Sequence, residues 1–228
     1  MLVGYKRAAS KKILVINNKG GSGKSTLAIS LAALCSNKGI KTELIDLDPQ
    51  CISYQWGFAS KNIRSQKFLP TSHVPFSLAL RLEADTQITI IDSPSNVSKF
   101  DLEKYTSMAD IIVVPTQSTP IEQQSLRNFL PKLTATRAVS SKSVKIGCVV
   151  TRSQDCQSIE PIEQMLSERN IAFIGQMSEQ CAYQNMFLHP ECSFDDQQDR
   201  LLWNTMFDWL NIEDRSMNDE TATTLAIA

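Results

Sequence analysis

The sequence predicts a single-domain α/β fold, in which a doubly wound and mostly parallel sheet is flanked by helices. Short apolar runs alternate with longer helical segments along most of the chain, which is the pattern of a parallel sheet with helical crossovers. A glycine-rich loop separates the first apolar run from the first helical segment. Two later apolar runs end in aspartates, Asp46 and Asp92. Open parallel sheets bind ligands at the carboxyl ends of their strands, so we expect the glycine-rich loop and the two aspartates to meet at one edge of the sheet.

Composition limits the classes of protein to consider. The 228 residues, of which 42% are hydrophobic and 21% charged, suffice for one sizeable globular domain. The formal net charge of −1 gives no overall sign of nucleic-acid binding, so any DNA contact requires a local patch. The six cysteines form no C-x-x-C pair, which favours reduced thiols over a zinc or iron–sulfur site. Without a long apolar run or a signal-peptide core, we expect a soluble, cytoplasmic protein.

We divide the chain into three parts. Residues 1–12 form a basic extension with four Lys or Arg and no acidic residue. Residues 13–210 form the folded domain, with no repeat or low-complexity linker inside it. Residues 211–228 contain four acidic residues against one arginine, and we expect this tail to be disordered.

The first element is a strand over residues 13–16, followed by a loop and a helix over residues 27–34. The loop carries a phosphate-binding sequence: Lys19-Gly20-Gly21-Ser22-Gly23-Lys24-Ser25-Thr26. Glycines let successive N–H groups point inward, and the helix adds its positive end. Lys24 then reaches the β- and γ-phosphates, and Ser25 can ligate Mg²⁺. This context predicts a nucleoside triphosphate site, although Asn18 stands at the first glycine position of the ordinary pattern.

The next strand lies within residues 41–50 and ends in Asp46 and Asp48. Their period of two places both carboxylates on one side of the strand end, where we expect them near the γ-phosphate and its metal. A helix over residues 51–61 carries Trp56 and Phe58 and is expected to cap the pocket. A short strand near residues 68–69 and a helix over residues 76–82 follow.

The strand over residues 87–92 ends in Asp92, the form of a Walker B element whose carboxylate holds Mg²⁺ directly or through water. The loop at residues 93–96 is small and suited to sensing the γ-phosphate. The remaining expected elements are helices at 101–108, 121–133, 161–169 and 199–210, and strands at 111–115, 144–150 and 171–174.

Three stretches together resemble the ParA/MinD family of deviant Walker ATPases. They are the loop with its extra Lys19, the Asp46-Leu47-Asp48-Pro49-Gln50 segment, and Asp92-Ser93-Pro94. The shortness of the chain resembles small ParA partition proteins that lack an N-terminal DNA-binding domain. One departure is Ser95, which stands where the family usually has a second proline. The resemblance also implies ATP, rather than GTP, as the nucleotide.

The resemblance implies an ATP-dependent homodimer with Mg²⁺ as cofactor. Lys19 would cross the interface to the partner's phosphates, Lys24 would act within its own subunit, and Asp48 would orient the attacking water. Ser25 would ligate Mg²⁺, with Asp46 and Asp92 on the metal side. Two facing triphosphates repel each other, so a lysine supplied in trans makes dimerisation depend on bound ATP.

The resemblance further implies non-specific DNA binding and release by a ParB-like or other small partner that stimulates hydrolysis, and therefore a nucleoid-associated protein. Four basic residues are candidate DNA contacts: Arg137, Lys142, Lys145 and Arg152. Taken alone, each is more often an ordinary solvated charge, so the DNA prediction rests on the resemblance more than on charge.

Two alternatives stay open. A ParA-like ATPase can instead position a protein cargo over the nucleoid, and a metabolic ligase can use the same scaffold. A membrane-bound switch of the MinD type is not expected, because residues 221–228 contain no Lys or Arg to form a basic amphipathic helix.

Overall fold

The computed structural model describes residues 10–68, 82–141, 144–153, 158–179, 181–190, 197 and 199–212. Its seven strands form one sheet in the order β3-β2-β4-β1-β5-β6-β7, and every neighbouring pair is parallel. The predicted α/β fold is therefore confirmed. The strands are β1 (Lys11–Val15), β2 (Thr42–Asp46), β3 (Arg64–Lys67), β4 (Ile88–Asp92), β5 (Ile111–Thr116), β6 (Lys145–Ser153) and β7 (Ala172–Ser178).

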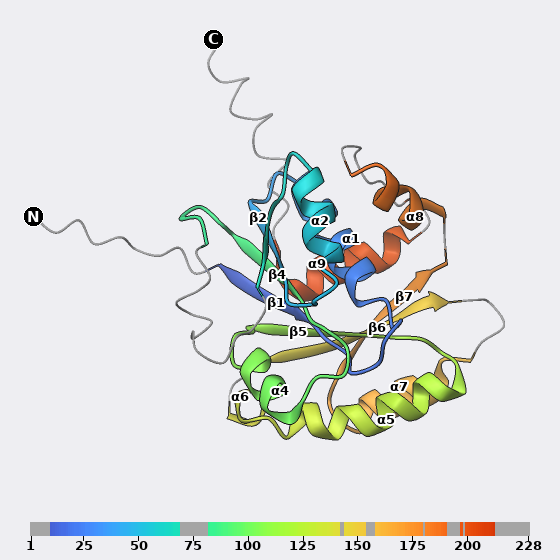
Figure 1. Ribbon diagram of the computed structural model, residues 1–228. Helices are drawn as coiled ribbons and strands as arrows, with labels where there is room; N and C mark the ends of the chain where they lie inside the picture. The colour runs from blue at the N-terminus through green and yellow to red at the C-terminus, as the bar shows by residue number, and fades with distance from the viewer. Residues whose placement is uncertain are drawn as a thin grey trace, which may run out of the picture.

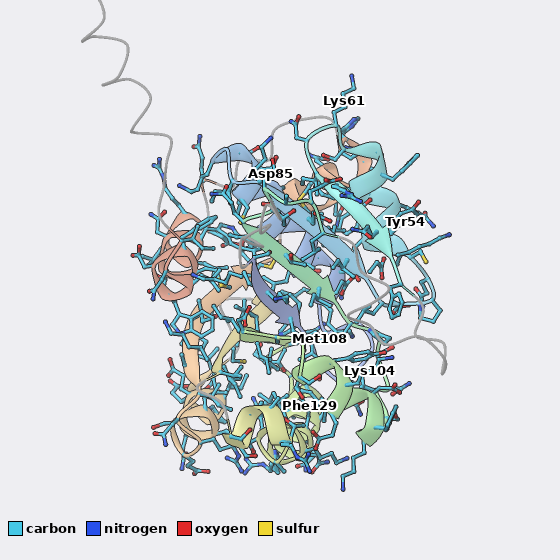
Figure 2. The ribbon with its side chains drawn as sticks, turned by 90° about the vertical axis from the view of Figure 1, so that its left-hand side faces the viewer. Tyr54, Lys61, Asp85, Lys104, Met108 and Phe129 are labelled. Atoms are coloured by element: carbon cyan, nitrogen blue, oxygen red, sulfur yellow. The ribbon has the colours of Figure 1, made fainter. Side chains whose placement is uncertain are left out.

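Helices cover both faces of the sheet (Figure 1). One layer contains α1 (Lys24–Asn37), α2 (Ile52–Ala59), α8 (Cys181–Leu188) and α9 (Arg200–Leu210). The other contains α4 (Lys99–Thr106), α5 (Pro120–Thr134), α6 (Arg137–Ser141) and α7 (Glu160–Ser167). Figure 2 shows Tyr54 of α2 and Phe129 of α5 in these separate layers. The chain thus builds the three-layer arrangement of a doubly wound fold.

Two hydrophobic cores lie between the sheet and its helices. Ile13 and Val15 of β1 belong to the core beneath α1, α2 and α9, whereas Leu14 belongs to the core beneath α4, α5 and α7. Alternate side chains of a strand face opposite sides of its sheet, so a strand between two helical layers is apolar throughout. This explains why the central strands read as continuous apolar runs in the sequence.

Three elements differ from the sequence-based expectation. The third strand is β3, at Arg64–Lys67, rather than near residues 68–69, and the short helices α6 and α8 were not expected. The β3 sequence Arg-Ser-Gln-Lys carries no apolar signal because β3 is a border strand, paired on one side by β2. The expected helix at 76–82, residues 1–9 and residues 213–228 lie outside the described residues, apart from Leu82.

Trp56 does not lie over the phosphate loop. It is buried in the core with α1 and α8, and its indole Nε1 donates a hydrogen bond to the backbone oxygen of Met186 at 2.8 Å. Phe58, two residues later, is 78% exposed. Helix α2 is therefore anchored to α8 through Trp56, and capping of the nucleotide pocket by the rest of this helix stays a prediction.

The register of the sheet sets the position of the site. Asp92 at the end of β4 pairs with Val15 of β1 on one side and with Asp46 of β2 on the other. Three neighbouring strands therefore finish level. The phosphate loop and both carboxylates emerge side by side at the carboxyl edge, where open parallel sheets bind their ligands.

Candidate nucleotide site

The phosphate loop between β1 and α1 is anchored to its neighbours on both sides. Asn17 donates from Nδ2 to the backbone oxygen of Pro115, which belongs to β5, at 2.7 Å. The Asn96 N–H donates to the Asn18 oxygen at 2.9 Å, which ties the loop to the segment after β4. A movement of that segment would therefore be transmitted to the phosphate loop through this hydrogen bond.

Two glycines give the loop its curl. Gly21 and Gly23 have φ angles of 78° and 86°, in the left-handed region that glycine adopts at little cost. A Cβ on Gly23 would also come within 3.0 Å of the Thr151 side chain. Thr151, at the end of β6, donates from Oγ1 to the Ser22 oxygen at 3.0 Å, so it closes the loop from the opposite side. Sequence reasoning missed Thr151, because its role depends on the approach of a strand that lies far along the chain.

Helix α1 begins with an open amino terminus. Its N-cap residue is Gly23, which has no side chain to accept from the first N–H groups, and the first turn contains no acidic residue. The first N–H groups of a helix have no partner within it, and the helix dipole adds positive potential there. This helix start is therefore suited to an anion such as a phosphate.

Lys24 lies almost buried inside the loop, with 7% of its surface exposed. Its Nζ donates to the backbone oxygen of Lys19 at 3.0 Å. Burial lowers the pKa of this lysine, while the negative charges of Asp92, Asp48 and Glu122 act in the opposite direction. A bound triphosphate can offer oxygens in place of the Lys19 carbonyl, so the lysine is held where a phosphate needs it.

The Asp92 carboxylate is completely buried. Burial, and secondly the like charge of Asp46, raise its pKa to about 7, while the hydroxyls of Ser25 and Ser53 and the charge of Lys24 lower it. Neither Asp92 oxygen makes a hydrogen bond of normal geometry with any described residue, and the Ser53 hydroxyl also lacks one. A buried polar atom without a partner costs free energy.

These orphaned oxygens fit a hydrated Mg²⁺ between Ser25 and Asp92. The described residues contain no group of three or more His, Cys, Asp or Glu that would hold a metal alone. Mg²⁺ commonly keeps several waters and takes its other ligands from substrate phosphates, so such a cluster is not needed.

Asp46 and Asp48 differ in how much of their carboxylates is already used. Asp46 is buried, and its two oxygens accept from the N–H groups of Asp48 and Tyr54 at 2.8 and 2.9 Å. Asp46 therefore shapes the turn into α2, and metal ligation by Asp46 stays a prediction. Asp48 is half-buried and accepts from the Gln50 N–H at 2.9 Å. The charge of Asp48 acts on Lys24, and its predicted role in orienting the attacking water stays a prediction.

Lys19 makes an unexpected contact. Its Nζ lies 2.5 Å from Oε1 of Glu122, a buried residue in the first turn of α5. The side chains of Lys19 and Glu122 are 35% and 5% exposed. Sequence reasoning missed Glu122 because 103 positions separate it from Lys19. An acidic residue after a Thr-Pro helix start also has a plain local explanation in helix capping.

The three candidates for DNA contact that the structure describes do not all lie close together. Lys145 and Arg152 lie at opposite ends of β6, about 23 Å apart at the usual rise of an extended strand. Lys145 also donates from Nζ to the Trp209 oxygen at 3.4 Å. Arg137 begins α6, and Lys142 lies outside the described residues. DNA contact by these residues stays a prediction.

Among the helices that the structure describes, none combines the length and apolar character needed to span a bilayer.

Comparison with known proteins identifies related chains. The family described as the CobQ/CobB/MinD/ParA nucleotide binding domain matches residues 13–184. One relative is named maintenance of carboxysome distribution protein A and comes from Gloeobacter kilaueensis. It is 27% identical over 135 residues, which cover 57% of this chain and 62% of that protein. Protein ParA from Rhizobium radiobacter is 25% identical over 113 residues, covering 48% of this chain and 50% of its own. The matched parts thus span less than two thirds of these relatives.

Solved structures share the fold over most of their length. A putative plasmid partition protein from Borrelia burgdorferi bound to AMPPNP superimposes with a TM-score of 0.66 at 19% identity, covering 89% of this chain and 99% of that one. The ATP complex of a Cyanothece McdA variant gives a TM-score of 0.67 at 15% identity, covering 90% of this chain and 98% of that one. At these identities the similarity shows the fold.

Proposed function

Because this chain belongs to the ParA/MinD family of P-loop proteins, we propose that it is an ATPase that dimerises on ATP and binds DNA non-specifically. A partner protein then stimulates hydrolysis and releases it, so that plasmid or chromosomal DNA is segregated. The observation that carries this proposal is Lys19. It adds a second lysine to the phosphate loop, with its side chain one-third exposed, from where it would reach the phosphates of a second copy.

The side chains divide the work at the site. Lys24 and the first N–H groups of α1 hold the phosphates of their own nucleotide, and the partner copy supplies its Lys19. Mg²⁺, when bound, neutralises phosphate charge. Ser25 and Asp92 would hold it and its water shell. Asp48 orients the attacking water, and catalysis is mainly positioning and charge stabilisation.

A second candidate is an ATPase of the same mechanism that positions a protein cargo over the nucleoid. Two observations favour considering it. One matched relative is named for carboxysome distribution, and the described DNA-contact candidates do not form one patch. A metabolic ligase on this scaffold remains the third reading.

The deciding experiment measures binding to a non-specific DNA duplex with ATP, ADP or no nucleotide, over a salt series, with oligomeric state determined in parallel. We expect ATP-dependent dimers whose DNA affinity falls with salt by a log–log slope of about −0.9 per phosphate contact. Lys19→Ala should bind ATP but not dimerise, whereas Asp48→Ala should accumulate as the ATP dimer. Lys41→Ala, which removes an exposed lysine at the other end of the sheet, is the charge-matched control.

Each alternative gives a different result in that experiment. A normal ATP dimer that ignores DNA at every salt concentration would favour the protein-cargo function. Absence of any ATP dimer, with turnover that responds to a small carboxylic acid, would favour the ligase. Normal dimerisation of Lys19→Ala would contradict the trans role of this lysine.

A further inference from the structure

We propose that Glu122 is a latch that holds Lys19 within its own subunit until a triphosphate enters the site. This inference rests on the proposed function of Lys19, the lysine given to the partner copy. Glu122 is a positioning residue: it controls whether Lys19 is available to a second copy.

The geometry of the pair favours a firm hold. Lys19 Nζ lies within hydrogen-bond distance of Glu122 Oε1, and the two groups carry opposite charges, so the contact is a charge-assisted hydrogen bond. Because the carboxylate is almost wholly buried, water screens this pair less than an exposed one. Glu122 is also fixed through its backbone, since its N–H donates to Oγ1 of the N-cap residue Thr119. Lys19, on a loop and partly exposed, is the partner that can move.

The second oxygen of Glu122 gives no sign of a structural purpose. Its Oε2 is buried and has no hydrogen-bond partner among the described residues. A carboxylate that served to join elements of the fold would be expected to use both oxygens, because buried polar atoms normally find partners. Glu122 instead directs its contact at the one lysine that the dimer requires.

The phosphate loop connects this latch to the nucleotide. The backbone oxygen of Lys19 accepts from Lys24 Nζ at 3.0 Å and from Ser22 Oγ at 3.2 Å. A triphosphate that draws Lys24 onto its oxygens removes a donor from the Lys19 carbonyl. The charge of Glu122 also acts on Lys24, so the carboxylate keeps a cationic neighbour when Lys19 leaves. Nucleotide entry and lysine release are therefore coupled through adjacent contacts.

The latch has a clear consequence for assembly. Without ATP, each copy meets another with its Lys19 already neutralised by Glu122. With ATP, the lysine becomes available just when the partner's phosphates create a site for it. A ligand shifts such an equilibrium only by interacting differently with the two states, and the exchange of Lys24 provides that difference.

The test compares Glu122→Gln with the wild-type chain and with Glu163→Gln. The control removes the same charge from an exposed position on α7. Sedimentation velocity is used to measure the dimer fraction as ATP is increased. We expect Glu122→Gln to dimerise at an ATP concentration lower by roughly fivefold or more, a typical size for coupling between sites. An unchanged or higher ATP midpoint would overturn the latch.

A second measurement uses the nucleotide-free chain and does not depend on dimerisation. Reductive methylation followed by mass spectrometry gives the labelling rate of Lys19, with exposed Lys41 as the internal reference. We expect Glu122→Gln to label faster at Lys19 by at least severalfold, whereas Glu163→Gln should match the wild type. Failure of the wild type to form any ATP dimer would refute the proposed function, while this labelling would still decide the latch.

Glu122→Asp serves if the glutamine variant folds poorly. It keeps the charge but shortens the side chain by one methylene, so the contact with Lys19 Nζ is lost or lengthened. Both measurements should change in the same direction, by less. Unaltered Lys19 labelling in the folded aspartate variant would overturn the proposal.

Discussion

Two buried carboxylates at opposite ends of the sheet are treated very differently by the fold. Glu43, near the amino end of β2, is 2% exposed. It accepts from the Glu83 N–H at 2.6 Å, Thr86 Oγ1 at 2.5 Å and Gln66 Nε2 at 2.8 Å. Asp92, at the carboxyl end of β4, is more deeply buried and has no such partner in the described part of the chain. One end of the sheet satisfies its buried charge, and the other leaves it open.

The same contrast holds for the other orphaned groups. Among the described residues, the buried side-chain oxygens without partners belong to Asn18, Ser53, Asp92 and Glu122. Each lies at the end of β4 or in the segment that follows β1, β2 or β5, all at the carboxyl edge. Native proteins rarely leave such atoms unpaired, so their concentration at one edge marks where a ligand supplies the missing partners.

Lys24→Ala should have the largest effect on the open end. Lys24 is the cation held within the phosphate loop. Burial lowers its pKa, and the carboxylates of the same site raise it. We expect ATP affinity to fall by at least about 100-fold, the loss of two or more charge-assisted hydrogen bonds, with little change in unfolding temperature. Calorimetric titration with ATP measures the first and thermal denaturation the second; retained tight binding would contradict the loop assignment.

Glu43→Ala should have the reverse pattern. It removes the acceptor of three hydrogen bonds, leaving their donors unsatisfied, and one of the two acidic partners of Arg64. We expect unfolding to become easier by about 3 kcal/mol, with ATP affinity unchanged within about twofold. Urea denaturation gives the stability, and exposed Glu163→Ala on α7 is the control. A large loss of nucleotide affinity without loss of stability would break the contrast between the two ends.

Asp92→Asn should show that the open end costs stability in the absence of ligand. Burial raises the pKa of Asp92 to about 7 from 3.8, so the folded chain retains a proton that the unfolded chain has already lost. The contribution of Asp92 to the free energy of unfolding therefore falls as pH rises from about 4 to 7. At pH 8 we expect the nucleotide-free asparagine variant to be more stable than the wild type, by up to a few kcal/mol.

That difference between Asp92→Asn and the wild type should disappear near pH 4, and urea denaturation at several pH values measures it. The same variant should lose the additional stabilisation that Mg²⁺ gives to the ATP complex. A stability difference that does not vary with pH would mean that the Asp92 carboxylate is not held in its neutral form in the nucleotide-free chain.

The sequence predicts the features that depend on local pattern. The apolar run before Lys24 and the aspartates after two later runs correctly indicated the parallel sheet, because strands covered on both faces must be apolar throughout. The Asp46 and Asp92 ends were expected at one edge, and the register brings them level. These inferences need only strand periodicity and chain direction.

What sequence reasoning missed arises from contacts between distant segments. Glu122, Thr151 and Ser53 carry no motif, and each acquires its role from a loop or strand that folding brings to it. The predicted position of strand β3 was wrong by a few residues, because a polar border strand is defined by its pairing with β2 rather than by its own composition. Tertiary context decides such positions, and no local signal replaces it.

The level ends of β1, β2 and β4 have a consequence for how fast the protein can respond to a nucleotide. A seven-stranded parallel sheet gives the phosphate loop and both carboxylates a rigid common base, so the response to a nucleotide can be confined to side chains and short loops. Such motions occur in picoseconds to microseconds. The sheet then adds no slow step of its own, and under the proposed function the lifetime of each state would be set by nucleotide binding, hydrolysis and release.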